Sequence, residues 1–308
     1  MRATEIDQEK NMKKCLITGV SGLIGSHLVS ELSQNWHITG LSRSKRICDL
    51  QSTEFEHLAL DLSKKLDTSL LPEKIDAVIH LAQSENFREF PKLADDIFQV
   101  NTVSTLVLLD YARRAGARTF ILASSGGIYG YGEQDFSEDV EISANGDLGF
   151  YLGTKLCSEV LANSYIPFFN IIVLRFFFVY GHSQRRSMLI PRLVESVLER
   201  KPITLQGENG IRINPTYVSD AVAAISRSLE LDGSHKINVA GANVLSLREI
   251  GEIIGKVVER KPKFDLQLDA NPRHLVGDIS RMSKILGSPK VNFADGIKIY
   301  INKTYGIV

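Results

Sequence analysis

The sequence predicts an α/β fold, a doubly wound parallel sheet followed by a smaller C-terminal α/β lobe. Three observations lead to this prediction. A glycine-rich turn with Gly19, Gly22 and Gly25 joins a short apolar run to a stretch of helical spacing. Apolar runs then alternate with helical stretches as far as Phe177, as in parallel sheets that helices cover on both faces. Beyond Gly181 the alternation changes, which indicates a second lobe.

Composition excludes several classes of partner. The chain has 308 residues, enough to bury a large core, with 36 Lys plus Arg and 36 Asp plus Glu, so neither nucleic acid nor an anionic membrane is expected as a partner. Cys15, Cys48 and Cys157 lie too far apart for a metal knuckle and indicate reduced, cytoplasmic packing with no metal. No run is apolar enough to span a bilayer, no signal peptide opens the chain, and the polar residues 1–11 are expected to form a loose tail.

The glycine turn is the first candidate binding site. The strand before it is expected at residues 15–17 and the helix after it at 27–34. Gly19 lets the chain reverse, Gly22 lets a ligand approach the backbone, and Gly25 lets the helix lie close to the sheet. The helix N-terminus would then present N–H groups to an anion such as a pyrophosphate. The alternative is a glycine-rich turn that binds nothing.

The remaining elements follow in order along the chain. Further strands of the sheet are expected at 36–41, 55–60, 75–81, 118–123 and 170–177, and helices at 93–115 and 151–164. The first domain would span 12–180, with 214–240 returning to its sheet, and the smaller, substrate-binding lobe 181–308. In that second half, helices are expected at 188–199, 219–229, 246–259, 280–286 and 293–304, and strands at 203–205 and 236–239.

Two clusters indicate acid–base chemistry. Tyr151 and Lys155 are four residues apart on a predicted helix and share one face. A tyrosine pKa of about 10 must fall by about three units for the side chain to act as a base near neutrality, and a neighbouring ammonium favours the phenolate. The serines of Ala123-Ser124-Ser125-Gly126-Gly127 follow a strand, where a hydroxyl can hold a substrate hydroxyl and relay its proton. An amphipathic helix and a serine-rich turn without chemistry are the alternatives.

Six motifs together carry a family resemblance. They are Thr18-Gly19-x-x-Gly22-x-x-Gly25, His80-Leu81-Ala82, Asn101, Ser124-Ser125-x-x-Ile128-Tyr129-Gly130, Tyr151-x-x-x-Lys155 and Leu174-Arg175-x-x-x-Val179-Tyr180-Gly181. In order and spacing the chain resembles, from Met12 onward, the extended short-chain dehydrogenase/reductases with a Rossmann domain. In particular it resembles the NAD-dependent epimerase/dehydratase family, which acts on nucleotide sugars.

The resemblance implies roles for individual residues. Ser125, Tyr151 and Lys155 match the family's catalytic set, whereas His80 matches a structural position. The residues implied in cofactor binding are Gly19, Gly22, Leu23, Ile24 and Gly25 at the turn, Asp61 and Leu62 beside the adenine, Leu81 and Ala82 under the cofactor, Asn101 and Ser124 beside the site, Tyr151 and Lys155, and Phe177 against the nicotinamide.

The position after the second strand departs from the family pattern. NAD-dependent members usually carry Asp or Glu there, to bind the ribose 2′-hydroxyl. This chain has Ser42, followed by Arg43, Lys45 and Arg46. Because a serine with an arginine accepts a 2′-phosphate that a carboxylate would repel, the sequence favours NADP, with NAD as the alternative.

Further departures concern the substrate. Family dehydratases carry Asp-Glu after the catalytic hydroxyl residue, but Gly126-Gly127 here transfers no proton, which disfavours dehydration. Phe178 replaces the usual substrate-holding Asn. Arg212 and Arg273 are the candidates for gripping the nucleotide diphosphate. Together with Ser125 and Gly126 these residues form the expected substrate site.

The resemblance implies an NAD(P)-dependent nucleotide-sugar epimerase, an isomerase that oxidises and re-reduces a sugar carbon. The alternatives are a nucleotide-sugar 4-ketoreductase or dehydratase, an oxidoreductase acting on another carbonyl, and a regulatory protein that senses NAD(P) without turnover. Family dimers pair the helices that correspond to residues 93–115 and 151–164. A homodimer is therefore expected.

Overall fold

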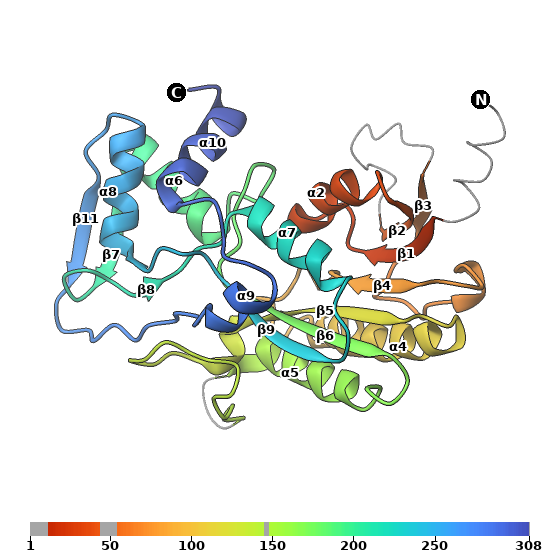
Figure 1. Cartoon of the computed structure of the whole chain (residues 1–308). Coiled ribbons are helices and arrows are strands. Elements are labelled where there is room, and N and C mark those ends of the chain that lie inside the picture. The colour runs from red at the N-terminus through yellow and green to blue at the C-terminus, as the bar shows by residue number, and fades with distance from the viewer. Residues whose placement is uncertain (1–11, 44–53, 145–147, 308) are drawn as a thin grey trace. The chain divides into compact units, whose positions relative to one another are not determined.

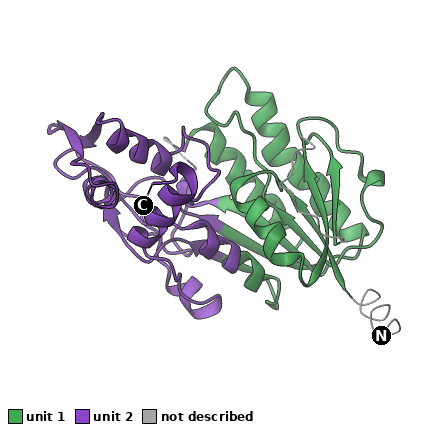
Figure 2. Ribbon diagram, turned by 90° about the horizontal axis from the view of Figure 1, so that it is seen from above, with its two compact units in different colours: residues 1–124, 149–174, 225–236 green, residues 125–148, 175–224, 237–308 purple. Residues whose placement is uncertain are grey.

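The computed structural model describes residues 12–43, 54–144 and 148–307 (Figure 1). The predicted tail, Lys45, Arg46 and Cys48 lie outside these residues. The chain divides into unit 1 (1–124, 149–174 and 225–236) and unit 2 (125–148, 175–224 and 237–308), coloured green and purple in Figure 2. Each unit is assembled from separate chain segments, whereas the sequence analysis expects two nearly consecutive domains, and the predicted boundaries of those domains stay a prediction.

Within the described residues, seven strands form one sheet in the order β3-β2-β1-β4-β5-β6-β9. The strands are β1 (Lys13–Thr18), β2 (Trp36–Ser42), β3 (Phe55–Ala59), β4 (Ala77–His80), β5 (Thr119–Ser125), β6 (Asn170–Phe176) and β9 (His235–Val239). The ladders that join β3, β2, β1, β4 and β5 are parallel. The strand order confirms the doubly wound fold, with the direction of winding reversing between β1 and β4.

Helices cover this sheet on both faces in Figure 1, with α4 and α5 side by side on one face and α2 on the other. They are α2 (Leu23–Leu32), α3 (Ala94–Phe98), α4 (Ser104–Arg114) and α5 (Gly149–Asn163). The predicted start of the first helix at residue 27 is wrong. Gly22 is the N-cap, and the Ser26 N–H already donates to the Gly22 carbonyl at 3.0 Å. The low helix propensity of glycine hides this first turn in the sequence.

The predicted single helix over 93–115 is also corrected. A five-residue π-helical turn, Gln99–Val103, separates α3 from α4. Such turns are frequent at functional sites, and this one contains Asn101. On α4, Leu108 and Ala112 pack with Leu16, Val78 and other buried residues in an apolar core of unit 1.

His80 is a buried polar residue at the end of β4. Its Nδ1 lies 2.7 Å from the Thr18 hydroxyl and its Nε2 3.1 Å from the Thr105 hydroxyl. Burial, helped by the charge of Lys155, lowers the pKa of His80 to about 3. The ring is therefore neutral at physiological pH and links β1, β4 and α4, which is a structural role.

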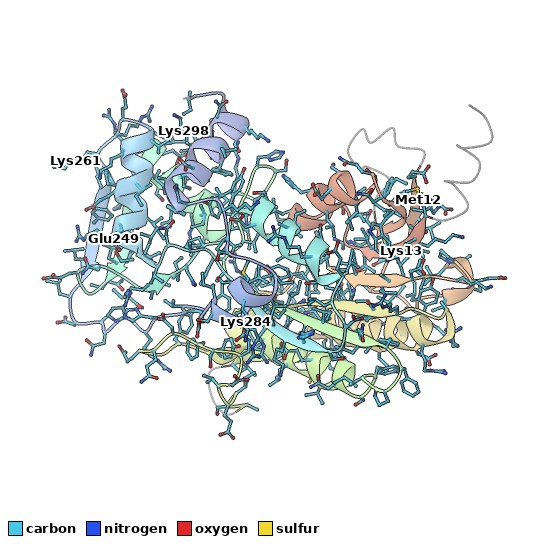
Figure 3. The ribbon with its side chains drawn as sticks, in the orientation of Figure 1. Met12, Lys13, Glu249, Lys261, Lys284 and Lys298 are labelled. Atoms are coloured by element: carbon cyan, nitrogen blue, oxygen red, sulfur yellow. The ribbon has the colours of Figure 1, made fainter. Side chains whose placement is uncertain are left out.

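Unit 2 contains small sheets and helices. Its elements are α6 (Leu189–Leu198), β7 (Pro202–Gln206), β8 (Arg212–Ile213), β10 (Leu245–Ser246), α8 (Leu247–Val257), β11 (Lys263–Gln267), α9 (Ser280–Ile285) and α10 (Phe293–Tyr305), and α7 (Val218–Ser228) falls in both units. β7 pairs with β11, and β8 with β10. Glu249, labelled in Figure 3, closes a capping box with Ser246 at the start of α8.

Three strands of unit 2 are absent from the sequence prediction. β8 and β10 have two residues each, too few to show a period. β11 alternates polar and apolar residues, but it has only five and is largely exposed, so its pattern is weak. Among the described residues, no helix combines the length and apolar character that a membrane span requires.

Candidate functional site

The carboxyl ends of four strands meet at one edge of the sheet. Thr18 lies opposite both Leu41 and His80, and His80 lies opposite Leu122. The segments that follow these strands therefore leave the sheet at a common edge, where doubly wound folds bind their ligands. The glycine turn follows β1, Arg43 follows β2 and Leu81-Ala82 follow β4, and Ala123 and Ser124 lie at the end of β5 itself.

The glycine turn leaves no room for side chains. Gly19 has a φ of +76°, and a Cβ on it would lie 2.9 Å from the Ala82 nitrogen. A Cβ on Gly25 would lie 2.2 Å from the Gly19 carbonyl oxygen. Gly22 is the N-cap of α2 and makes no side-chain hydrogen bond. The backbone N–H groups of Leu23 and Ile24, at the start of the helix, are therefore not covered by a capping side chain. This backbone cradle at a helix N-terminus fits a pyrophosphate.

The segment after β2 carries an ion pair that the sequence did not predict. The Arg43 guanidinium lies 2.8 Å from the Glu85 carboxylate, with both side chains about half exposed. Ser42 is buried, and its Oγ lies 3.0 Å from His57 Nε2. Glu85 belongs to the loop after β4, so this pairing follows from strand order and no local pattern signals it.

Asp61 and Leu62 follow β3. Burial tends to raise the pKa of Asp61, but hydrogen bonds from Ser63 outweigh it and hold that pKa below its usual value. The Leu62 side chain is buried. The expected place of this pair beside an adenine stays a prediction.

Asn101 connects two segments of unit 1. Its Oδ1 accepts a hydrogen bond from the Ser84 N–H at 2.8 Å, and its Nδ2 donates to the Thr154 hydroxyl at 2.9 Å. The side chain is buried, and both ends of its amide are engaged. Asn101 therefore holds the loop after β4 against α5.

Tyr151 and Lys155 lie one turn apart on α5. The Tyr151 hydroxyl donates to Gln83 Oε1 at 2.8 Å, and the Lys155 ammonium donates to the Ala123 carbonyl at 2.9 Å. Burial raises the pKa of the Tyr151 phenol, because a phenolate loses water there. This direction is opposite to the lowering by Lys155 that the sequence analysis expects. Burial also lowers the pKa of Lys155 to about 8, although the charge of Glu159 acts to raise it.

Ser124 and Ser125, the last residues of β5, make different contacts. The Ser124 hydroxyl is buried and donates to Glu159 Oε1 at 2.6 Å, so it faces α5. The Ser125 hydroxyl accepts from the Gly127 N–H at 3.1 Å and keeps its own proton to donate. Ser125 belongs to unit 2, while Ser124, Tyr151 and Lys155 belong to unit 1.

Phe177 is a buried residue of unit 2. Its ring is 1% exposed and packs with Ala240 and Leu275. A Cβ on Gly126 would lie 2.3 Å from this ring, so only glycine fits there. The ring packs in a core of unit 2, and the expectation that it lies against a nicotinamide stays a prediction. A core aromatic and a cofactor-facing aromatic look alike in sequence.

Phe178 has a φ of +43°, in the left-handed region. Bulky side chains seldom adopt this conformation, whereas asparagine does so readily. The partly buried Phe178 ring packs against the Phe177, Ala240 and Leu275 cluster. Phe178 therefore holds a backbone conformation that asparagine adopts more readily than phenylalanine.

Arg212 and Arg273, the predicted diphosphate ligands, are exposed and lie on adjoining segments of unit 2. The Arg212 N–H donates to His274 Nδ1 at 3.0 Å, and the Leu275 N–H donates to the Arg212 carbonyl at 3.0 Å. The Arg273 guanidinium donates to the Tyr131 carbonyl at 2.7 Å. The structure thus pairs the backbones of two segments that are far apart in sequence, one carrying Arg212 and the other following Arg273.

Comparison with known proteins identifies the family. Residues 15–240, well over half of the chain, match the NAD dependent epimerase/dehydratase family. The chain belongs to this family. The predicted resemblance is confirmed, as is the doubly wound fold that it implies.

Several members of the epimerase/dehydratase family are similar over nearly their whole length. A Bacillus subtilis protein named as an uncharacterized UDP-glucose epimerase, YtcB, is 30% identical, with 92% of this chain and 95% of the relative covered. UDP-glucuronate 4-epimerase of Thermodesulfobacterium geofontis is 28% identical, with 93% and 94% covered. The crystal structure of UDP-glucuronic acid 4-epimerase from Bacillus cereus with UDP-glucuronic acid and NAD has a TM-score of 0.82, 28% identity and coverage of 94% and 98%.

Three residues that contact the predicted site residues of this chain were not predicted from its sequence. Gln83 contacts Tyr151, Glu85 contacts Arg43, and Glu159 contacts Ser124. A signal was present for Glu159 alone, because it lies four residues beyond Lys155 and so shares its helix face.

Proposed function

We propose that the protein is an NAD(P)-dependent nucleotide-sugar epimerase that inverts the hydroxyl-bearing C4 of a UDP-hexose. The observation that carries the proposal is the pairing of Tyr151 and Lys155 on one face of α5, with the ammonium anchored to the Ala123 carbonyl at the end of β5. The relatives named as UDP-glucose epimerase and UDP-glucuronate 4-epimerase support the choice of sugar nucleotide and carbon.

The proposed roles follow from the chemistry of each side chain. NAD(P), when bound, would accept a hydride from the sugar carbon and return it to the opposite face of the resulting ketone. Tyr151 Oη takes the proton of the sugar hydroxyl, and Ser125 Oγ holds that hydroxyl through a hydrogen bond. The N–H groups of Leu23 and Ile24 bind the cofactor pyrophosphate, and Arg212 and Arg273 bind the UDP diphosphate.

Epimerisation is favoured over dehydration by the surroundings of Gly126. A proton-transferring side chain at this position would collide with the Phe177 ring, which lies 2.3 Å from the site of a Cβ. The test is to incubate the protein with a panel of UDP-sugars and NAD(P), and to identify the products by NMR. A C4 epimer supports the proposal. A 4-keto-6-deoxy product, or no turnover of any sugar nucleotide, contradicts it.

We infer that Arg43 favours NADP over NAD and that Glu85 opposes this preference. The guanidinium can bind a 2′-phosphate through charge-assisted hydrogen bonds. The Glu85 carboxylate at 2.8 Å competes for the same guanidinium and repels a phosphate. The proposed cofactor is therefore a nicotinamide dinucleotide, NADP or NAD, with the balance set by these two side chains.

Calorimetry with NAD and NADP tests the roles of Arg43 and Glu85. We expect Arg43→Ala to weaken NADP binding by about tenfold or more, since hydrogen bonds to charged groups contribute roughly 1.5–3 kcal/mol each, and to leave NAD binding unchanged. Glu85→Gln is expected to strengthen NADP binding alone. Arg113→Ala, an exposed arginine on α4, is the control. Equal affinity of the wild type for both cofactors, together with no effect of Arg43→Ala, would refute this inference.

We also propose a homodimer that pairs α4 and α5 of two copies. Among the described residues, the exposed apolar side chains include Phe98 on α3, Leu106 on α4 and Val160 on α5. Light scattering at micromolar concentration is expected to give the mass of a dimer, and Val160→Glu that of a monomer. Lys298→Glu on α10, labelled in Figure 3, is the control. A monomeric wild type would rule the dimer out.

We further propose a cytoplasmic location. Of the cysteines that the structure describes, Cys15 and Cys157 are both free thiols, and Cys157 is exposed. Free exposed thiols persist in a reducing compartment. Fluorescence microscopy of the tagged protein in its own cells tests the location, and signal confined to an oxidising compartment would contradict it.

A further inference from the structure

A third ionisable residue, Glu159, lies on the face of α5 that carries Tyr151 and Lys155. Successive members of this set are four residues apart and therefore stack along one face of the helix. Glu159 is only 1% exposed. Glutamate is almost never buried to this extent unless it is paired, and the proposed chemistry of Tyr151 gives it no role.

Glu159 and Lys155 contact consecutive residues of β5. The Ser124 hydroxyl donates to Glu159 Oε1 at 2.6 Å, and the Lys155 ammonium donates to the Ala123 carbonyl at 2.9 Å. Two charged side chains of α5 thus hold the end of β5 at adjacent positions. Displacing either one would move the strand end that both of them grip.

Glu159 acts on Lys155 and also pairs with a second cation. Lys236 on β9 has its ammonium 4.0 Å from Glu159 Oε2, and His80 on β4 is neutral because its pKa is about 3. Two acids on the helices packed against α5 are engaged elsewhere: Asp96 of α3 accepts from Ser84 and Asn86, and Asp110 of α4 pairs with Arg113 and Arg114. Within the described chain, Glu159 is the acid whose field acts on Lys155.

We propose that Glu159 is a positioning residue for Lys155: its buried carboxylate keeps the Lys155 ammonium charged and, through Ser124, holds the end of β5 against α5. An ammonium in an apolar site sheds its proton unless an opposite charge compensates for the lost water. Burial already lowers the pKa of Lys155 to about 8, against the opposing effect of Glu159. Without Glu159, a larger fraction of Lys155 would be neutral near pH 7.

The titration of Lys155 in the cofactor-free full chain tests this inference directly. Lysine labelled with 13C at Cε is followed by NMR across pH, and Lys155→Met identifies the resonance. The expected midpoint is about 8 in the wild type. It should lie lower by about one unit or more in Glu159→Gln, since a neighbouring opposite charge shifts a pKa by roughly 1–3 units. Ser124→Ala keeps the carboxylate and should move the midpoint less.

Glu138→Gln is the matched control. Glu138 is a buried carboxylate of unit 2 that accepts from the Asn238 N–H at 2.7 Å, so its loss should leave the Lys155 midpoint in place. If Glu159→Gln does not fold, Glu159→Asp withdraws the carboxylate by one methylene and should lower the midpoint by a smaller amount. An unmoved Lys155 midpoint in whichever of these variants is folded overturns the inference.

The effect on turnover rests on the proposed function and is measured separately. On the UDP-sugar that the panel identifies, the alkaline limb of the kcat/KM profile is expected to move to lower pH in Glu159→Gln and to stay in place in Glu138→Gln. Epimerase activity with an unmoved limb and an unmoved Lys155 midpoint overturns the inference alone. A midpoint that shifts in a protein that turns over no UDP-sugar contradicts the proposed function alone.

Discussion

Replacing Tyr151 with phenylalanine is expected to lower turnover by at least about a hundredfold, because general acid–base catalysis contributes roughly 10²–10⁴ in rate. The substitution removes the oxygen that donates to Gln83 at 2.8 Å. The ring remains, with its packing against Phe87 at a centroid distance of 5.1 Å, so the fold should barely change. Cofactor affinity should stay within a few-fold of the wild type. Turnover is measured on the identified UDP-sugar, and cofactor affinity by nicotinamide fluorescence.

Tyr165→Phe, just beyond α5, is the control for this prediction and should behave as the wild type. A Tyr151→Phe variant with nearly full turnover would show that another group takes the proton. A variant that loses turnover and cofactor affinity equally would assign Tyr151 to binding, because a group needed only in the transition state changes turnover alone.

Lys155→Met is expected to lower both turnover and cofactor affinity, turnover by at least about a hundredfold and affinity by about tenfold. Methionine approximates the length of lysine in a site that is 4% exposed, so the packing is largely kept. The charge and the hydrogen bond to the Ala123 carbonyl are lost. In the proposed mechanism the ammonium supports the ionisation of Tyr151 against the opposing effect of burial, and it also holds the nicotinamide ribose. Retained cofactor affinity would exclude the second of these roles.

The lowered pKa of Lys155 predicts how the stability of the protein depends on pH. Its pKa is about 8 in the folded protein and 10.5 in the unfolded chain, so between these values the unfolded chain binds more protons. The contribution of Lys155 to stability therefore rises with pH from about 8 to 10.5 and is least favourable below 8. The free energy of unfolding is measured in urea at pH 7 and at pH 10. The rise that Lys155 contributes between these pH values should be present in the wild type and absent in Lys155→Met. An identical rise in both proteins would contradict it.

The elements that could be predicted from sequence are those with a strong local pattern. β4 reads as a continuous apolar run and is buried throughout. α5 has helical spacing over many residues, and the predicted doubly wound sheet is confirmed. Other features carry no such pattern, because the π-helical turn Gln99–Val103 keeps helical composition and the strand pair β8–β10 is too short to alternate.

The sequence by itself determined the glycine turn and the placement of Tyr151 and Lys155 on one helix face, because backbone sterics and a 3.6-residue period act between near neighbours. Only the tertiary structure decided what those residues contact. It paired Arg43 with Glu85, set Tyr151 against Gln83, and buried Phe177 against Gly126. Each of these contacts joins distant segments that strand order and core packing bring together, and neither of these is written in a local pattern of residues.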